Sequence, residues 1–168
     1  MVENVTQATD VDAGPVETMF AADRASRSLG IELVHHGEGT AVLRMTVTPD
    51  MVNGHRIAHG GFLFLLADTA FACACNSHGP VTVAAAADIV FVAPAREGDV
   101  LVATACERTR YGRSGIYDVT VRRITGDPGE ARAVEGDGGE GGGQAGEVIA
   151  EFRGRSRSIR SEKNKESQ

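Results

Sequence analysis

The sequence predicts an α+β domain in which a curved antiparallel sheet wraps one long central helix. The first observation is the stretch 62–76, which is apolar nearly all round and holds Asp68 as its only ionisable carboxyl group. A helix of this kind is buried on most sides rather than lying at a surface. The second observation is that several segments with strand character follow this stretch along the chain. A sheet made of those consecutive strands would cover the helix.

A shorter helix is predicted ahead of this core, over residues 15–29. Apolar residues recur there at helical spacing, Pro15 suits the first turn, and Gly30 suits the stop. Residues 1–14 are expected to form a flexible lead, so the folded domain is predicted to span 15–160.

The strand predictions rest on alternation with a period of two residues. Leu43, Met45 and Val47 alternate with polar side chains between residues 40 and 48, which is typical of a half-buried strand. Further strands are predicted at 81–92, 99–109, 115–124 and 147–159.

A glycine-rich and acidic segment, 126–146, lies between the last two predicted strands. It has too few apolar groups to offset the entropy cost of ordering the chain. We therefore expect a flexible insertion there, forming a lengthened hairpin loop, and a flexible polar tail over 161–168.

Bulk properties narrow the function classes. The chain has 168 residues, enough for one domain with a sizeable core. Its net charge of −6 argues against nucleic acid as a partner, because such proteins need a basic surface. No apolar run reaches the length of a transmembrane helix, and the first residues lack the apolar core of a signal peptide. We therefore expect a cytoplasmic protein without a membrane partner, with its cysteines reduced.

Asp68 is the leading functional residue, because a carboxylate inside an apolar helix is costly unless it has partners. Gly60 and Gly61 precede that helix, whose first turn carries unpaired N–H groups and the positive end of the dipole. Such a turn can hold a carbonyl oxygen that becomes negative. Gly60 and Asp68 would lie roughly 12 Å apart along one helix, so two copies of the chain would have to build the site together. A structural role for Asp68, as a loop cap or as the partner of an arginine, stays open.

An ordered series of motifs runs from this segment to the last predicted strand. The motifs, in chain order, are Met51-Val52-Asn53-Gly54-His55, His59-Gly60-Gly61-Phe62, Leu66-Ala67-Asp68-Thr69-Ala70-Phe71-Ala72, Cys75-Asn76-Ser77, Phe91, Pro94-Ala95, Gly98-Asp99, Gly115-Ile116-Tyr117-Asp118-Val119 and Ala150-Glu151-Phe152-Arg153-Gly154. This series strongly resembles the signature of hotdog-fold acyl-CoA thioesterases of the phenylacetate-pathway (PaaI) type. The resemblance covers residues 16–160, apart from the insertion.

The resemblance implies a hotdog fold, in which a long helix lies in the curl of an antiparallel sheet. It implies an obligatory homodimer that forms a dimer of dimers. It also implies hydrolysis of an acyl-CoA with an aryl-acetyl group, such as phenylacetyl or hydroxyphenylacetyl, without a cofactor.

The resemblance further implies roles for single residues. Asp68 would attack the thioester carbonyl directly or activate a water, and the Gly60 N–H would donate to the oxyanion. Asn53 and His59 would line the reacting end, and Gly61 would leave room for the thioester. The alternatives are a structural hydrogen bond from His59 and a tight turn at the two glycines.

Some relatives of this family place a serine or threonine on the strand after the helix, facing the acid. The corresponding stretch here, 82–88, is mostly alanine. Strict alternation would put Thr82 on the same strand face as Asp88. These two residues are therefore the remaining candidates for a substrate-binding side chain on that strand.

Arginines offer a second class of substrate contact. They cluster at Arg108, Arg110 and Arg113 and again at Arg153, Arg155, Arg157 and Arg160. The members at 153, 155 and 157 share one strand face, and guanidinium groups match the phosphates of coenzyme A. Arg110, Arg113 and Arg155 are predicted to bind them, and a solvated strand edge is the equal alternative.

Other chemistries find little support. His55 and His59 are four residues apart, but no acidic partner or HExxH pattern accompanies them, so no metal site is predicted. The GxSxG turn of serine esterases is absent from the sequence. Two alternatives to a thioesterase remain within the hotdog fold: an enoyl-CoA hydratase, and a non-catalytic acyl-CoA-binding protein.

Overall fold

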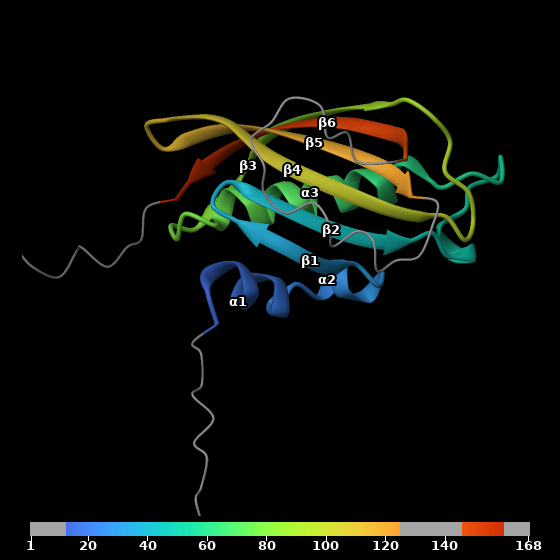
Figure 1. The fold of residues 1–168 in the computed structure, drawn as a ribbon, viewed down its shortest axis with the longest axis horizontal. Coiled ribbons are helices and arrows are strands. Elements are labelled where there is room, and N and C mark those ends of the chain that lie inside the picture. Colours follow the sequence, from blue (N-terminus) through green and yellow to red (C-terminus); the bar gives the residue numbers. More distant parts are fainter. Residues whose placement is uncertain (1–12, 125–145, 160–168) are drawn as a thin grey trace, which may run out of the picture.

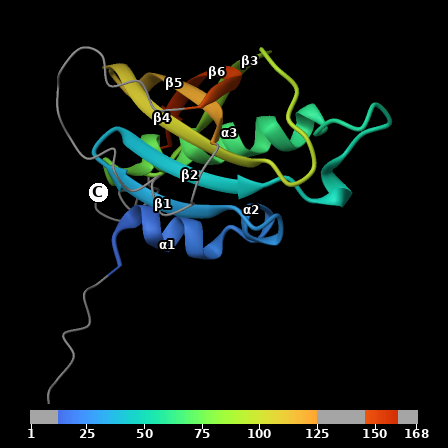
Figure 2. The ribbon, with the colours of Figure 1, turned by 45° about the vertical axis from the view of Figure 1, so that its right-hand side comes forward.

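The computed structural model describes residues 13–124 and 146–159, and it confirms the α+β hotdog architecture. Helix α3 (Gly60–Asn76) lies in the curl of a six-stranded antiparallel sheet with the strand order β1-β2-β4-β5-β6-β3. Figures 1 and 2 show α3 running beneath the arched strands, with α1 and α2 on the side of β1. The strands are β1 (Glu32–Gly37), β2 (Thr40–Thr46), β3 (Thr82–Phe91), β4 (Val100–Tyr111), β5 (Ser114–Ile124) and β6 (Glu147–Ser158).

Helix α3 is the centre of the core, as its apolar composition predicts. Leu66, Ala67 and Ala70 have no exposed surface. The Phe71 ring packs against the rings of Tyr117 and Phe152, with centroid distances of 5.5 and 5.9 Å. Full burial of a large apolar side chain stabilises the fold by about 1.5–3 kcal/mol. Aromatic packing therefore fixes the helix against β5 and β6.

The predicted helix 15–29 is in fact two helices, α1 (Pro15–Ala22) and α2 (Arg24–Ser28). The chain turns at Asp23, which has an extended backbone conformation and caps α2. Its carboxylate accepts hydrogen bonds from the Ser26 N–H at 3.0 Å and the Ser26 hydroxyl at 2.5 Å. Capping by aspartate ends one helix and begins another, which helical spacing alone does not reveal.

Strand β1 was not predicted. It is an edge strand that, within the described part of the chain, pairs with β2 alone, and its pairing register shifts between Leu33 and His35. The shift interrupts the two-residue alternation on which the strand predictions rest. The four predicted strands after the helix exist with bounds close to those expected, and the predicted strand 40–48 ends at Thr46.

A β-bulge in β3 corrects the prediction that Thr82 and Asp88 share a face. Thr82 pairs with Ser158 before the register shift at Ala85, and Asp88 pairs with Arg153 after it. One extra residue in a strand reverses the side on which later side chains lie. Thr82 is therefore buried on the helix side of the sheet, and Asp88 is exposed on the outer side.

The predicted insertion 126–146 joins two strands, β5 and β6, that pair antiparallel, in agreement with a hairpin connection. Residues 125–145 themselves lie outside the described residues. Residues 1–12 of the predicted lead and the whole predicted tail also lie outside them. No helix in the described part of the chain is long and apolar enough to cross a membrane.

Candidate active site

The backbone N–H groups in the first turn of α3 differ in whether they have a hydrogen-bond acceptor. The Gly61 N–H donates to Nδ1 of His59 at 3.0 Å, and the Phe62 N–H donates to the His59 carbonyl at 3.0 Å. Among the described residues no acceptor is recorded for the Gly60 N–H. It lies at the positive end of a helix of 17 residues, where an anionic oxygen is favoured.

Close packing, rather than backbone conformation, explains both glycines at the helix start. Neither has a positive φ. A Cβ atom on Gly60 would lie 2.8 Å from Cζ of Phe91, and a Cβ atom on Gly61 would lie 3.2 Å from Nδ1 of His59. The missing side chains therefore allow an aromatic ring from β3 and an imidazole to approach the first turn.

The loop before α3 is held on both sides. His59 N–H donates to the Met51 carbonyl at 2.8 Å, and Ala58 N–H donates to the Ala95 carbonyl at 2.8 Å. Within the loop, Oδ1 of Asn53 accepts the His55 N–H at 2.9 Å. Asn53 and His59 therefore belong to one ordered loop at the start of α3, and in a single chain both make structural hydrogen bonds.

Asp68 lies on the half-buried face of α3, together with Phe64, Leu65 and Ala72. No hydrogen bond or ion pair to its carboxylate is found among the described residues, so the alternative of an arginine partner receives no support from within the described chain. Burial raises the pKa of Asp68, and the negative charge of Asp23 on the neighbouring α2 raises it further. A carboxylate with a raised pKa is a stronger base when it is ionised.

A buried chain of hydroxyl groups fixes the helix beside Asp68. Ser26 contacts Asp23 through its hydroxyl and also meets Oγ1 of Thr69 at 2.8 Å. Thr69 in turn donates to the Leu65 carbonyl at 2.8 Å. The contact joins α2 to α3 at the residue next to Asp68, so α2 both orients this part of the helix and supplies a nearby negative charge.

Gly60 and Asp68 are two turns apart on the same helix, as predicted. Their separation of roughly 12 Å along the axis is too long for one carbonyl group to meet both. A catalytic pair therefore needs the Gly60 N–H from one chain and Asp68 from another.

Thr82 lies near the other end of α3. Its hydroxyl donates to the Pro80 carbonyl and contacts Ser158, and Asn76 binds its backbone on both sides. It lines a cavity of about 20 Å³ that is also bordered by Arg110 and Arg113. That volume holds about one water molecule. The structure therefore brings three predicted substrate-binding residues together, away from the first turn of α3 and around a space too small for a phosphate.

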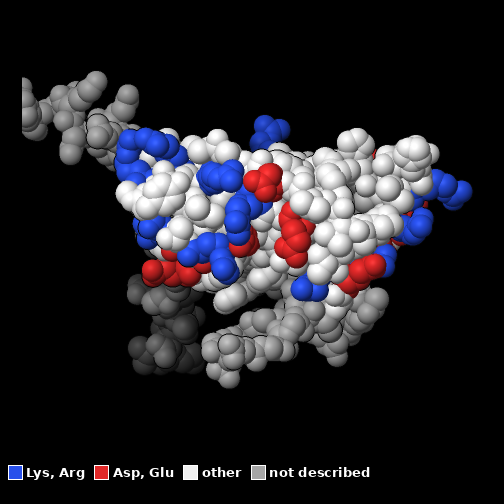
Figure 3. Space-filling model, turned by 90° about the horizontal axis from the view of Figure 1, so that it is seen from above, with Lys and Arg blue, Asp and Glu red and all other residues white. Residues whose placement is uncertain are grey.

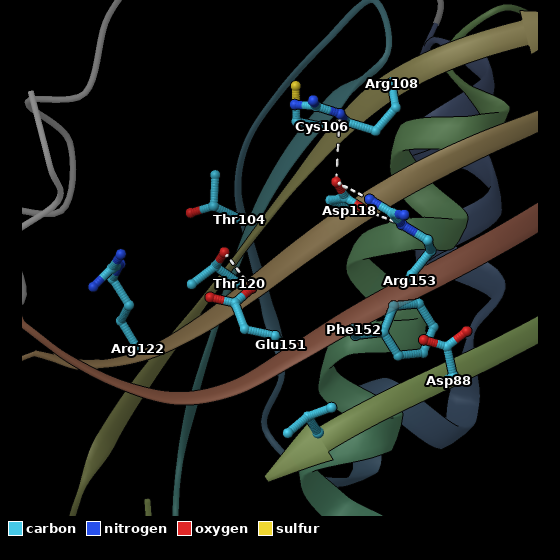
Figure 4. A pocket seen from close by; sticks show the side chains of 11 residues that line it. Asp88, Thr104, Cys106, Arg108, Asp118, Thr120, Arg122, Glu151, Phe152 and Arg153 are labelled. Carbon is cyan, nitrogen blue, oxygen red and sulfur yellow. Dashed lines mark hydrogen bonds and ion pairs between the residues drawn. The ribbon is translucent and has the colours of Figure 1, made fainter. Parts of the chain in front are cut away.

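Asp88 and Arg155 lie instead on the outer face of the sheet, the side away from α3. Their side chains approach to 3.6 Å, and Asp88 borders a cavity of about 610 Å³. Within this cavity Arg153 forms a two-pronged ion pair with Asp118 at 2.6 and 2.8 Å (Figure 4). Arg153 lowers the pKa of Asp118. The outer-face residues are thus paired with one another, and one chain does not bring them together with Asp68.

Seen from above, the molecule carries acidic and basic side chains close together on its upper surface (Figure 3). Arg108 adds a third contact to Asp118 at 3.4 Å. Since nearby opposite charges compensate one another, this face does not form the uniformly basic surface that phosphates would favour.

The described residues contain no group of three or more His, Cys, Asp or Glu side chains that could hold a metal ion. Phe91 lies against the start of α3, and the sequence analysis gave it no role. Its only signal was its place in the ordered motifs, because nothing in the sequence shows that a strand end lies against a helix start.

Comparisons with known proteins identify the family of the chain. The sequence profile of the thioesterase superfamily matches residues 55–129. The chain is 48% identical over 103 residues to the acyl-coenzyme A thioesterase PaaI of Escherichia coli K12, which covers 61% of this chain and 74% of that protein. It is 35% identical over 104 residues to a putative esterase of Archaeoglobus fulgidus, covering 62% and 68%.

Solved structures give the same result. The structure of E. coli PaaI, from the phenylacetic acid degradation operon, has a TM-score of 0.73 and 39% identity and covers 88% of this chain and 92% of its own. A mutant of the phenylacetic acid degradation protein PaaI from Thermus thermophilus has a TM-score of 0.65 and 30% identity, covering 80% and 97%. The similarity therefore extends over almost the whole length of these relatives.

Proposed function

This chain belongs to the thioesterase superfamily and is a thioester hydrolase related to PaaI, and on that premise we propose that it cleaves acyl-CoA with Asp68 and the Gly60 amide of a partner chain. The observation that carries the proposal is the Gly60 N–H. No described residue accepts a hydrogen bond from it, whereas the N–H groups of Gly61 and Phe62 both donate to His59.

The Gly60 amide would take no part in proton transfer. Its N–H would donate a hydrogen bond to the carbonyl oxygen of the thioester. This donor stabilises the carbonyl oxygen more strongly when it becomes negative during attack than when the thioester is neutral, because the helix dipole adds to the hydrogen bond. One such donor lowers a barrier by about 2.7–4 kcal/mol.

Asp68 would supply the attack. Either its carboxylate adds to the carbonyl carbon, forming an anhydride that water then hydrolyses, or it takes a proton from the water that adds. In both routes the C–S bond breaks, coenzyme A leaves as the thiol or thiolate, and the acyl group leaves as a carboxylic acid. No hydroxyl side chain among residues 83–88 is present to hold a water, which favours direct attack.

The exposed edge of the sheet supports the proposed oligomer. Among the described residues strand β3 is the last strand of the sheet and pairs with β6 alone, so no described strand covers its second edge. Phe64 and Leu65, which share the half-buried face of α3 with Asp68, add an apolar surface suited to a second copy. We propose a homodimer through this edge, and a dimer of dimers as the resemblance of the sequence implies.

The proposed substrate is an aryl-acetyl-CoA such as phenylacetyl-CoA or hydroxyphenylacetyl-CoA. Support comes from the E. coli relative, whose structure is described as a protein of the phenylacetic acid degradation operon. The aromatic ring of Phe91 beside Gly60 is also consistent with a flat acyl group.

The direct test is a panel of acyl-CoA thioesters assayed by release of free thiol. The expected result is hydrolysis by the wild type, strongest for aryl-acetyl groups, and a rate about 100- to 10,000-fold lower in the Asp68→Asn variant. Addition of water to an enoyl-CoA without thiol release would identify a hydratase instead. Binding of acyl-CoA without turnover would identify a non-catalytic binding protein.

A further inference from the structure

The structure places the Phe91 ring directly against the residue proposed to bind the thioester oxygen. A Cβ atom on Gly60 would lie 2.8 Å from Cζ of Phe91 and 3.3 Å from both Cε atoms. All three are atoms at the far end of the ring. The ring therefore points its tip at Gly60 rather than lying flat on the strand.

Phe91 is not explained as an ordinary core residue. It is the last residue of β3 and is 52% exposed, whereas Phe71 and Phe152 in the core are exposed by 1% and 3%. Its cross-strand partner on β6 is Ala150, a small residue that leaves space beside the ring. Half of a large apolar surface thus stays open next to the Gly60 N–H.

The position of the ring is set by the bulge in β3. Phe91 and Ile89 lie opposite Ala150 and Phe152, whose side chains are buried on the helix side. Val90, between them, lies opposite Glu151 and borders the outer-face cavity. Phe91 and Val90 are therefore neighbours on one strand with similar exposure, but only Phe91 meets the start of α3.

We propose that Phe91 is a specificity-determining residue that forms one wall of the acyl pocket and selects flat, aromatic acyl groups. This proposal rests on the proposed function, since it takes Gly60 as the donor to the thioester. A carbonyl oxygen bound to the Gly60 N–H at about 2.9 Å brings its first acyl carbons within reach of the ring. An aromatic acyl group there can pack edge to face or offset against Phe91, which a linear chain does less well.

The first experiment compares acyl groups in wild type, Phe91→Ala and the control Val90→Ala. Phe91→Ala should lower the ratio of kcat/KM for phenylacetyl-CoA over that for hexanoyl-CoA by about tenfold or more. Val90→Ala should leave the ratio unchanged. The same change should appear with N-acetylcysteamine thioesters of the two acids, because the ring would contact the acyl group and not the coenzyme. If Phe91→Ala does not fold, Phe91→Leu replaces it.

The second experiment tests the contact itself. Gly60→Ala keeps the N–H but adds a methyl group against the ring, so activity should fall. In the double variant with Phe91→Ala the methyl group has space, and activity towards hexanoyl-CoA should rise by about tenfold over Gly60→Ala alone. Recovery of this kind would not occur if Gly60 were needed for another reason.

The outcomes separate the two proposals. Wild-type hydrolysis with an equal loss for all acyl groups in Phe91→Ala would overturn the role of Phe91 and leave the thioesterase function standing. A loss seen with CoA esters but not with the truncated esters would place the ring on the coenzyme arm and would also overturn it. Absence of wild-type hydrolysis across the panel would overturn both.

Discussion

Nδ1 of His59 accepts the Gly61 N–H at 3.0 Å, and this contact fixes the protonation pattern of the imidazole. A nitrogen that accepts a hydrogen bond carries no proton, so the neutral ring holds its proton on Nε2. His59 is exposed and its ring meets Phe62 edge on. The capping residue of α3 therefore presents an N–H donor at the same helix start as the Gly60 amide.

Substitution of His59 should separate capping from catalysis. His59→Ala loses the cap and should lower the free energy of unfolding by about 1 kcal/mol, whereas His59→Asn keeps a capping acceptor and should lose less. If the Nε2–H contacts the thioester, both variants should lose kcat. Chemical denaturation and thiol release measure the two effects. Full activity in His59→Asn would leave the histidine a purely structural cap.

The shared site can be tested by mixing two inactive variants. Asp68→Ala and Gly60→Pro each destroy both sites of a homodimer, but a mixed dimer contains one site with both groups intact. Random assortment should restore about a quarter of full activity.

Gly60→Ala is the matched control for this experiment, since it adds the same Cβ atom next to Phe91 but retains the N–H. Gly60→Pro should be about 100- to 1,000-fold less active than Gly60→Ala, the usual cost of losing one oxyanion donor. Both parents must be folded, and subunit exchange must be verified. No recovery under those conditions would argue that each chain builds its own site.

Asp68 should couple activity and stability to pH in opposite directions. Activity needs the ionised carboxylate, so kcat/KM should fall as pH decreases through the pKa of Asp68, which burial raises from its ordinary value. Asp68→Asn should lower kcat by about 100- to 10,000-fold.

Stability follows the reverse sign, because a raised pKa means that the folded state favours the protonated acid. The stabilising effect is present below the unfolded pKa of about 3.9 and is lost as pH rises through the folded value. Asp68→Asn stays neutral, so it should melt at a higher temperature than the wild type at pH 7 and at a similar temperature at pH 3. Thermal unfolding at both values checks this, and an equal difference at the two would mean that the carboxylate charge is not involved.

Arginines that bind coenzyme A should be those without a partner inside the chain. Arg153 is held by Asp118, and Arg110 donates to His78 at 3.0 Å. Arg113 and Arg157 have no ion pair recorded among the described residues, and the Ser158 N–H donates to the Arg113 carbonyl, which brings the two strand ends together.

Replacing Arg113 and Arg157 with glutamine should raise KM for an acyl-CoA about tenfold and leave KM for the truncated thioester unchanged. Added salt should weaken the binding of the acyl-CoA and leave the binding of the truncated thioester unchanged. Arg153→Gln, which breaks an existing ion pair, is the control and should change neither value. Equal effects on both substrates would indicate a change in folding or assembly.

The insertion offers a fifth test. The last cross-strand pair recorded before it is Arg123 with Glu147, so a short turn can close the hairpin at that point. Excision of residues 127–145 should leave kcat within about twofold, because the paired strands on either side make the core contacts. Steady-state kinetics of the folded variant provide the measurement, and a large loss would show that the insertion reaches the site or the substrate.

The central helix and the strands after it could be predicted because their signals are periodic and local. The acid at Asp68 and the glycines at the helix start were also visible as exceptions within an apolar stretch. The break at Asp23 and the edge strand β1 could not be read in this way, since one depends on a cap and the other on an interrupted alternation. The catalytic roles of Asp68 and Gly60 stay predictions that depend on a second chain.

The bulge at Ala85 inserts one extra residue into β3 and so shifts the alternation of all later side chains by one position. Side chains after the bulge lie on the face opposite to the one that strict alternation would give. The start of the strand therefore places Thr82 in the core, and its end places Phe91 against Gly60. Asp88 points outward, towards Arg155. The same ten residues in a regular strand that kept Thr82 on the core side would turn an aspartate towards the helix and the aromatic ring towards solvent. A run of alanines, the least informative part of the sequence, therefore sets which chemical groups stand beside the Gly60 N–H.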